Sequence, residues 1–145
     1  MELVEKTFAE LTTEELFAIY RLRTAVFVVE QQCAYQEVDE FDPAAVHLWL
    51  REEGKILAYL RVLPGGTVFA EPSLGRVIAA ERRRGLGSRI VAEGIRAARQ
   101  RFGAAAIRIE AQTYARGLYE KQGFRQVSEE FLEDGIPHIQ MLWEA

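Results

Sequence analysis

The sequence predicts a mixed α/β fold in which a mostly antiparallel central sheet is flanked by helices. Between residues 46 and 80, segments with the alternating polarity of strands follow one another across tight turns. A long stretch with helical spacing comes next, and another strand-like segment follows it over residues 105–111. Because a strand–helix–strand unit implies a parallel strand pair with a right-handed crossover, the sheet should be antiparallel at its start and mixed beyond.

The first expected elements are a helix and a loop. Thr12 or Thr13 can cap a helix whose first turn carries two glutamates, where the helix dipole favours acidic residues. Apolar residues continue at helical spacing as far as Phe27, which predicts one helix or a kinked helix pair. The stretch 33–43 has neither periodicity and is predicted to be a loop.

The remaining elements follow from turns and periodicity. Alternating strands are expected over 46–51, 56–62 and 74–80, separated by glycine-containing turns that make them antiparallel. A long helix should begin near Gly85 and end at Gly103, a residue type that commonly terminates helices. The last expected elements are a strand over 105–111, a short helix over 114–122, and strands over 126–132 and 138–143.

Length and composition bound the function. The 145 residues carry no linker-like shift in composition, so one domain over residues 1–145 is expected. The net charge of −4 argues against general nucleic-acid binding, which needs a basic face. One cysteine and two histidines exclude an internal disulfide and supply a metal centre poorly. With no apolar run of membrane length and no signal-peptide core, no membrane association and a cytoplasmic location are expected.

The most informative segment is Arg82-Arg83-Arg84-Gly85-Leu86-Gly87-Ser88, between a predicted strand and a predicted helix. Unpaired N–H groups at a helix start bind phosphate, the two glycines permit close approach, and the arginines add positive charge. The alternative is a helix start with a solvated basic patch, and the spacing alone leaves both interpretations open. The segment lacks the Gly-Lys-Ser/Thr of a Walker loop and the third glycine of the dinucleotide-binding motif.

Several blocks resemble the ElaA-like branch of the GNAT N-acetyltransferases. Arg82-x-x-Gly85-x-Gly87 resembles the acetyl-CoA pyrophosphate loop of that family, and counting back from Gly85 favours Arg82 over Arg84 as its leading arginine. The other blocks that resemble the family span most of the chain in order: Val26-Phe27-Val28-Val29-Glu30-Gln31, Cys33-x-Tyr35-Gln36, Gly75-Arg76-Val77-Ile78, Ala111-Gln112, Ala115-x-x-x-Tyr119-x-x-x-Gly123-Phe124 and Glu133-Asp134-Gly135-Ile136-Pro137-His138-Ile139.

The resemblance implies a donor site. In such a fold the strands that contain Val77 and Ile109 splay apart, and pantetheine pairs with the backbone of Val77, Ile78 and Ala79. The expected phosphate-binding residues are Arg82, Arg83, Arg84, Gly85, Leu86, Gly87 and Ser88. Tyr119 is implied to be the general acid that protonates the departing thiolate. From composition alone, a tyrosine at this place is more often a core residue.

The acceptor side is less well defined. His138 is implied to lie near the acceptor cleft and is a candidate base or substrate contact, although it can equally be a histidine paired at a strand edge. The loop of Tyr35, Gln36 and Asp39 carries several acids, which either are solvated or attract a cationic amine. Gln112 and Asp134 complete the expected substrate-binding residues, and His47 is expected to be structural.

The resemblance therefore implies an acetyl-CoA-dependent N-acetyltransferase in which a primary amine attacks the thioester directly. Its partners would be a small-molecule or peptide amine and acetyl-CoA, without metal, nucleic acid or membrane, and the chain would be a monomer or homodimer. Two alternatives stay open: a non-catalytic acyl-CoA-binding module, and an enzyme similar to the acyl-homoserine lactone synthases. Binding of S-adenosylmethionine would distinguish the second.

Overall fold

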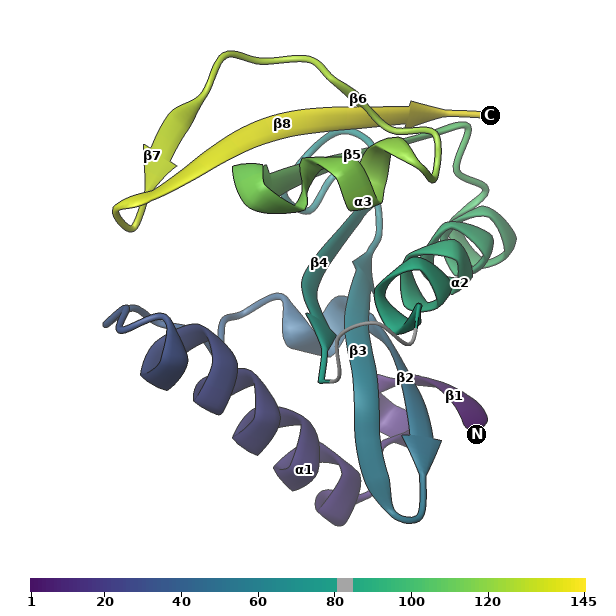
Figure 1. The fold of residues 1–145 in the computed structure, drawn as a ribbon. Helices are drawn as coiled ribbons and strands as arrows, with labels where there is room; N and C mark the ends of the chain where they lie inside the picture. Colours follow the sequence, from purple (N-terminus) through teal and green to yellow (C-terminus); the bar gives the residue numbers. More distant parts are fainter. Residues whose placement is uncertain (81–84) are drawn as a thin grey trace.

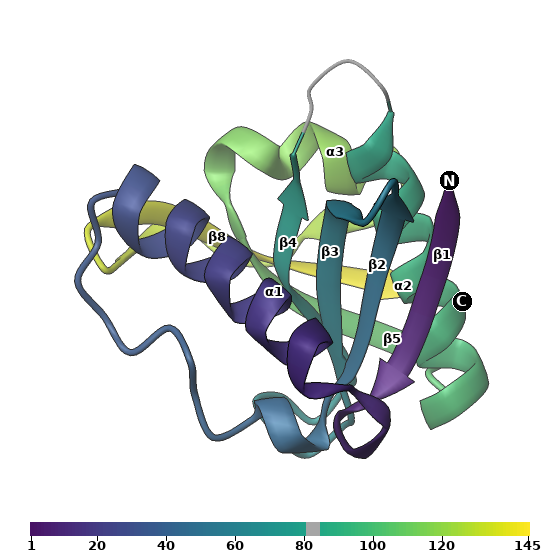
Figure 2. The same cartoon turned by 90° about the horizontal axis from the view of Figure 1, so that it is seen from below.

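The computed structural model describes residues 1–80 and 85–145. Four antiparallel strands in the order β1-β2-β3-β4 form sheet A (Figure 2). Their bounds are β1 Glu2–Thr7, β2 Val46–Glu52, β3 Lys55–Leu63 and β4 Ser73–Ala79. The predicted hairpins on either side of β3 are therefore confirmed.

The C-terminal third forms sheet B, in the order β5-β8-β6, with β7 also paired to β8. Its strands are β5 Ala106–Gln112, β6 Arg125–Gln126, β7 Phe131–Glu133 and β8 Ile136–Glu144. The expected strand over 126–132 is wrong as a single element, because it divides into β6 and β7. Between them the Ser128 hydroxyl accepts a hydrogen bond from the Gln140 N–H (2.8 Å), so a side chain replaces the strand's backbone as the partner of β8.

The helices are α1 Thr13–Thr24, which continues into a π-helical segment Ala25–Glu30, α2 Leu86–Phe102 and the short α3 Arg116–Glu120. Thr12 caps α1, since its hydroxyl accepts from the Glu15 N–H (3.1 Å) while the Glu15 carboxylate accepts from the Thr12 N–H (2.8 Å). Gly103 ends α2 in the left-handed conformation (φ 60°), as its position predicts. In the described residues no helix is both long and apolar enough to cross a membrane.

α1 and α2 cover opposite faces of sheet A (Figures 1 and 2). On the α2 side, Leu48 and Leu60 of the sheet pack with Ile90 in the larger core cluster. On the α1 side, Ile19 packs with Trp49 and Tyr59 in a second cluster. Because successive residues of a strand point to opposite faces, β2 and β3 contribute to both clusters and are buried on both sides.

One glycine brings α2 close to the sheet. A Cβ atom on Gly94 would lie 2.8 Å from Leu60 Cδ2 and 3.2 Å from Leu74 Cδ1, both in the buried core. Glycine at this position therefore allows α2 to lie directly on β3 and β4.

The two sheets part between β4 and β5. These strands form no ladder with each other in the part of the chain that the structure describes. A hydrogen bond from the Arg108 N–H to the Pro72 carbonyl (3.0 Å) joins β5 to the residue just before β4. Beyond that point β4 pairs only with β3 within residues 1–80 and 85–145, so its other edge has no strand partner there.

Candidate active site

The first turn of α2 has the features of an anion-binding site. Gly85 precedes the helix in the left-handed conformation (φ 69°), and among the described residues no side chain caps the helix. The first N–H groups of a helix have no partner within it and lie at the positive end of its dipole. Leu86, Gly87 and Ser88 therefore offer backbone donors where the sequence predicts a phosphate site. The predicted contacts Arg82, Arg83 and Arg84 lie outside the described residues.

α3 packs directly against this helix start. A Cβ atom on Gly87 would lie 3.4 Å from Leu118 Cδ2, and the Gln122 side chain donates to the Ser88 carbonyl (3.2 Å). The helix that carries Tyr119 is thus held beside the predicted phosphate site.

The free edge of β4 leads toward the same helix start. The Ala80 N–H donates to the Leu57 carbonyl of β3 (2.7 Å), and Ile78 lies opposite Tyr59 in the register. Because backbone groups of a strand alternate in direction, Val77 and Ala79 direct theirs to the opposite, unpaired edge. Of the three residues that the sequence resemblance assigns to pantetheine, Val77 and Ala79 therefore face this edge, whereas the backbone of Ile78 faces β3.

Tyr119 is buried in the core, with 7% of its surface exposed, and its ring meets Phe124 edge to face at 5.7 Å. Burial, assisted by the nearby Tyr114, raises the pKa of the Tyr119 phenol well above its usual range. The phenol therefore carries its proton at neutral pH. Among the described residues no hydrogen-bond partner occupies its hydroxyl.

One face of sheet B gathers polar side chains from three strands. Gln112 lies opposite His138 in the β5–β8 register, and Phe131 of β7 lies opposite His138 on its other side. The His138 Nδ1 is 2.7 Å from the Ile136 carbonyl, so Nδ1 carries the proton of the neutral ring. Its Nε2 is then an acceptor and lies 3.8 Å from a carboxylate oxygen of Glu133.

Glu110 belongs to this group and was not among the residues predicted from sequence. It lies two residues before Gln112 on β5, with its side chain on the same face. Although the residue is exposed, burial of its carboxyl group and a hydrogen bond shared with Glu133 raise the pKa of Glu110 to about 7. The sequence gives no signal for this pair, because the two glutamates are 23 positions apart.

Residues 31–45 form a loop, hereafter the acceptor loop, whose first residues contact sheet B. The Gln31 and Gln112 side-chain amides exchange hydrogen bonds of 3.4 and 3.3 Å. The Cys33 sulfur lies 3.7 Å from the Asp134 carbonyl, in the turn between β7 and β8. Three of the predicted acceptor-side positions, Gln112, Asp134 and His138, therefore lie on or beside one face of sheet B, next to the acceptor loop.

Asp39 and Asp42 of the acceptor loop are not solvated, which corrects one of the two interpretations above for these two acids, whereas Glu40 is exposed. Asp42 is fully buried and binds the Arg23 guanidinium through two contacts of 2.7 and 3.1 Å. Asp39 binds Arg61 through two contacts of 2.6 and 2.8 Å. These carboxylates are neutralised by arginine, so they are poor candidates to attract a cationic substrate.

Tyr35 and Gln36, two further residues predicted to bind substrate, also lie in the acceptor loop. Tyr35 lies under the Arg76 guanidinium (5.6 Å to the ring centre), and Gln36 is exposed with its amide on the Val38 carbonyl. His47 is structural, as expected: it is buried, 2.7 Å from the Tyr59 hydroxyl and 3.1 Å from the Asp42 carbonyl.

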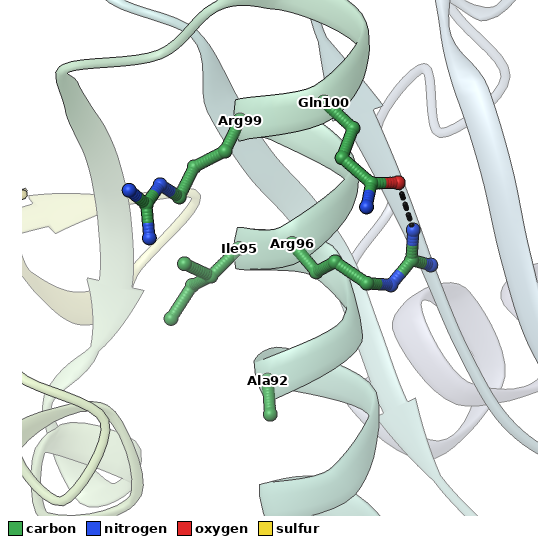
Figure 3. A pocket seen from close by; sticks show the side chains of 5 residues that line it. All are labelled: Ala92, Ile95, Arg96, Arg99 and Gln100. Carbon is green, nitrogen blue, oxygen red and sulfur yellow. Dashed lines mark hydrogen bonds between the residues drawn. The ribbon is translucent and has the colours of Figure 1, made fainter.

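A hollow of about 560 Å³ lies elsewhere, on the outer face of α2 (Figure 3). Its lining residues are Ala92, Ile95, Arg96, Arg99 and Gln100. None of the residues discussed above lines it, so it is not part of the candidate site. Residues 1–80 and 85–145 contain no group of three or more His, Cys, Asp or Glu side chains placed to hold a metal ion.

Comparison with known proteins gives the family. Residues 8–145 match the family model described as an acetyltransferase (GNAT) domain. The UPF0039 protein C11D3.02c of Schizosaccharomyces pombe is 42% identical over 148 residues, covering 99% of this chain and 97% of that protein. A crystal structure of an acyl-CoA N-acyltransferase from Pseudomonas aeruginosa has a TM-score of 0.90 and 38% identity, over 99% of both chains. The crystal structure of Escherichia coli ElaA has a TM-score of 0.92 and 31% identity, again over 99% of both.

The chain is an acyltransferase that belongs to the GNAT acetyltransferase family. Within that family it is similar to ElaA, and both the recognition and the fold class predicted from the sequence are confirmed. This family uses acyl-CoA, which fits the uncapped helix start and the unpaired edge of β4.

Proposed function

We propose that this protein transfers the acetyl group of acetyl-CoA to a primary amine, which attacks the thioester directly. The observation that carries the proposal is the continuity of the unpaired edge of β4 with the uncapped first turn of α2. Together they offer a row of backbone donors and acceptors to an extended ligand with a pyrophosphate at one end. The N–H groups of Leu86, Gly87 and Ser88 would hold the phosphates.

Tyr119 would supply the proton that the departing thiolate needs. Its phenol is kept neutral by burial, and α3 holds it beside the first turn of α2. A buried neutral phenol can donate a proton where charge develops on sulfur, because the surrounding core cannot stabilise that charge by solvation.

His138, Glu133 and Glu110 would accept the proton of the amine. A protonated amine has no lone pair, so the site must remove a proton before the attack. The His138 imidazole, whose Nδ1 lies on the Ile136 carbonyl, and the Glu110 carboxyl, whose pKa is raised to about 7, both meet this need. The acceptor class would be a small-molecule or peptide amine drawn to these carboxylates.

The direct test measures release of free CoA thiol with acetyl-CoA and a broad panel of amines, with mass spectrometry of the products. Acetylated amine confirms the proposal, and calorimetric binding of acetyl-CoA without turnover of any amine supports a binding module instead. Calorimetry with S-adenosylmethionine tests the alternative synthase, which must bind that compound.

Gly87→Glu tests the donor site. It places bulk and negative charge at the helix start, so we expect affinity for acetyl-CoA to fall at least about tenfold. Ala92→Glu adds the same charge to an exposed position further along α2 and is the matched control. Unchanged affinity in a folded Gly87→Glu protein would show that the phosphates do not bind at the start of α2.

Tyr119→Phe tests the acid. The variant keeps the ring that packs on Phe124 and loses only the hydroxyl. We expect kcat to fall by about 10²–10⁴-fold with little change in acetyl-CoA affinity. Full kcat in this variant would show that water protonates the thiolate.

A further inference from the structure

The acceptor loop is fastened to β4 by one side chain that the proposed reaction does not use. The Arg76 guanidinium donates to the Glu37 carboxylate (2.7 Å), to the Glu37 carbonyl (3.0 Å) and to the Asp39 carboxylate (3.2 Å). It also lies over the Tyr35 ring. One guanidinium therefore fixes the backbone and side chains of residues 35–39 together.

The backbone of Arg76 is itself unusual. It adopts φ 53°, in the left-handed region that non-glycine residues seldom occupy. At this point the β3–β4 register shifts, since Ile78 lies opposite Tyr59 whereas Gly75 lies opposite Arg61. Arg76 therefore forms a bulge in β4, and bulges re-aim the side chains and backbone that follow them. Here the residues that follow are Val77 and Ala79, whose backbone faces the unpaired edge.

The other arginines of the cluster bind the loop from elsewhere in the fold. Arg23 of α1 holds Glu37 and Asp42, and Arg61 of β3 holds Asp39 and Asp42; both are buried. Removal of Arg76 would therefore leave Glu37 with Arg23 and Asp39 with Arg61, so the loop would still be bound to α1 and β3. It would sever the connection from the loop to β4.

The loop also reaches the polar face of sheet B, through Gln31 and Cys33. It thus runs from the bulge of β4 to the side chains around His138. A guanidinium bound to two carboxylates and a carbonyl has little freedom to adjust, so a change in the backbone of β4 would reach that face through Arg76 and the loop.

We propose that Arg76 is a positioning residue that couples the donor strand β4 to the acceptor loop, so that acetyl-CoA bound along β4 orders the loop for the amine. The inference rests on the proposed function, because it takes β4 as the donor strand. Arg76 touches neither reacting group; it acts through the Glu37–Asp39 segment.

Hydrogen–deuterium exchange with and without acetyl-CoA tests the coupling. In the wild-type protein acetyl-CoA should slow exchange both at Val77–Ala79 and in residues 33–42. In Arg76→Gln the slowing at Val77–Ala79 should remain while that of the loop is lost. Arg76→Lys keeps the charge but lacks the planar fork, so it should restore part of the effect.

Kinetics with the best amine from the panel give a second readout. We expect Arg76→Gln to lower kcat/KM for the amine by about tenfold to hundredfold, as for a displaced substrate-positioning group, with KM for acetyl-CoA within about threefold of wild type. Arg96→Gln is the control, because it also removes an arginine that binds two carboxylates, Glu5 (2.6 Å) and Glu93 (2.7 Å), but from α2, which covers the face of sheet A opposite to α1 (Figures 1 and 2). It should behave as wild type in both experiments.

Two results would overturn the coupling: loop protection by acetyl-CoA that persists in Arg76→Gln, or wild-type protein with acetyl-CoA bound and no protection of the loop. Failure of wild-type protein to bind acetyl-CoA at all is a different result, which removes the proposed function and the coupling with it.

Discussion

The acceptor loop and sheet B both carry carboxylates near the candidate site, but the surroundings of the two groups are opposite. Asp39 and Asp42 each meet two arginines, and although burial alone would raise their pKa, the arginine hydrogen bonds lower the pKa of both below its usual value. Glu110 and Glu133 meet each other, and burial together with the shared hydrogen bond raises the pKa of Glu110 to about 7.

This contrast separates structural from reactive acids. A carboxylate held by arginines is charged at neutral pH because its pKa is lowered, so it can anchor a loop but is a poor acceptor of a proton from a substrate. Glu110, which shares a hydrogen bond with a second carboxyl group instead of an arginine, has a pKa of about 7 and can exchange a proton near neutral pH, as a catalytic base must. The sequence alone does not distinguish the acids of the acceptor loop from Glu110 and Glu133, because it shows the charged residues and not their partners.

The largest effect is expected when Arg23, which binds Glu37 and Asp42, is replaced. Arg23→Met leaves Glu37 and Asp42 buried without their nearest arginine, and we expect the free energy of unfolding to fall by about 3–5 kcal/mol in urea denaturation. Arg51→Met breaks an exposed pair with Glu2 and should cost about 1 kcal/mol or less. Equal effects of the two variants would mean that the buried cluster contributes no more than a surface pair.

Glu110→Gln tests the proposed role of the glutamates of sheet B. The amide has nearly the same size and can still form hydrogen bonds, but it cannot titrate. We expect kcat/KM for the amine to fall by about 10²-fold, with the acid limb of its pH profile displaced, and no loss of stability. Glu129→Gln, at an exposed position between β6 and β7, is the control. If His138→Gln abolishes the acid limb and Glu110→Gln leaves it in place, His138 is the base.

The smallest expected effect is on the pH dependence of stability. Asp39 and Asp42 have lowered pKa values, so their stabilisation is present above about pH 4 and is lost as the pH falls through their folded pKa. Glu110 has a raised pKa, so its contribution is complete below about pH 4 and is lost as the pH rises toward 7.

Calorimetric melting between about pH 5 and pH 8 should therefore show a shallow loss of stability that Glu110→Gln abolishes. The change should be under about 1 kcal/mol, because the glutamate is partly exposed and its charge is screened by solvent. A Glu144→Gln control, at an exposed ion pair, should keep the slope. A slope that persists in Glu110→Gln would locate the titrating group elsewhere.

The elements with strong local signals could be predicted from sequence. The cap at Thr12, the end of α2 at Gly103 and the hairpins around β3 each depend on a few adjacent residues, and the structure confirms them. β1 could not be predicted, because its alternation is weak and its register with β2 depends on residues some 40 positions away. The division of 126–132 depends on the Ser128–Gln140 contact, which is likewise not local.

The candidate site divides in the same way. The helix start at Gly85 and the position of Tyr119 follow from short motifs, whereas Glu110 and Arg76 gain their importance from partners across sheet B and across the acceptor loop. The resemblance to the GNAT family identified the first pair of features, and only the folded arrangement identifies the second.

Gly94 has no side chain, yet it determines how close α2 lies to sheet A and so where the proposed phosphate site is placed. A methyl group at this position would meet Leu60 and Leu74 in the buried core, so α2 would have to rise from the sheet or tilt. Gly94 lies about two turns along α2 from its first residue, and a tilt there would act as a lever on the proposed phosphate site. Because Gly94 has no side chain, it sets the distance between α2 and sheet A, and with it the position of the proposed phosphate site relative to β4. A redesign of this protein for a larger or smaller acyl-CoA would therefore have to start from the distance between helix and sheet at position 94.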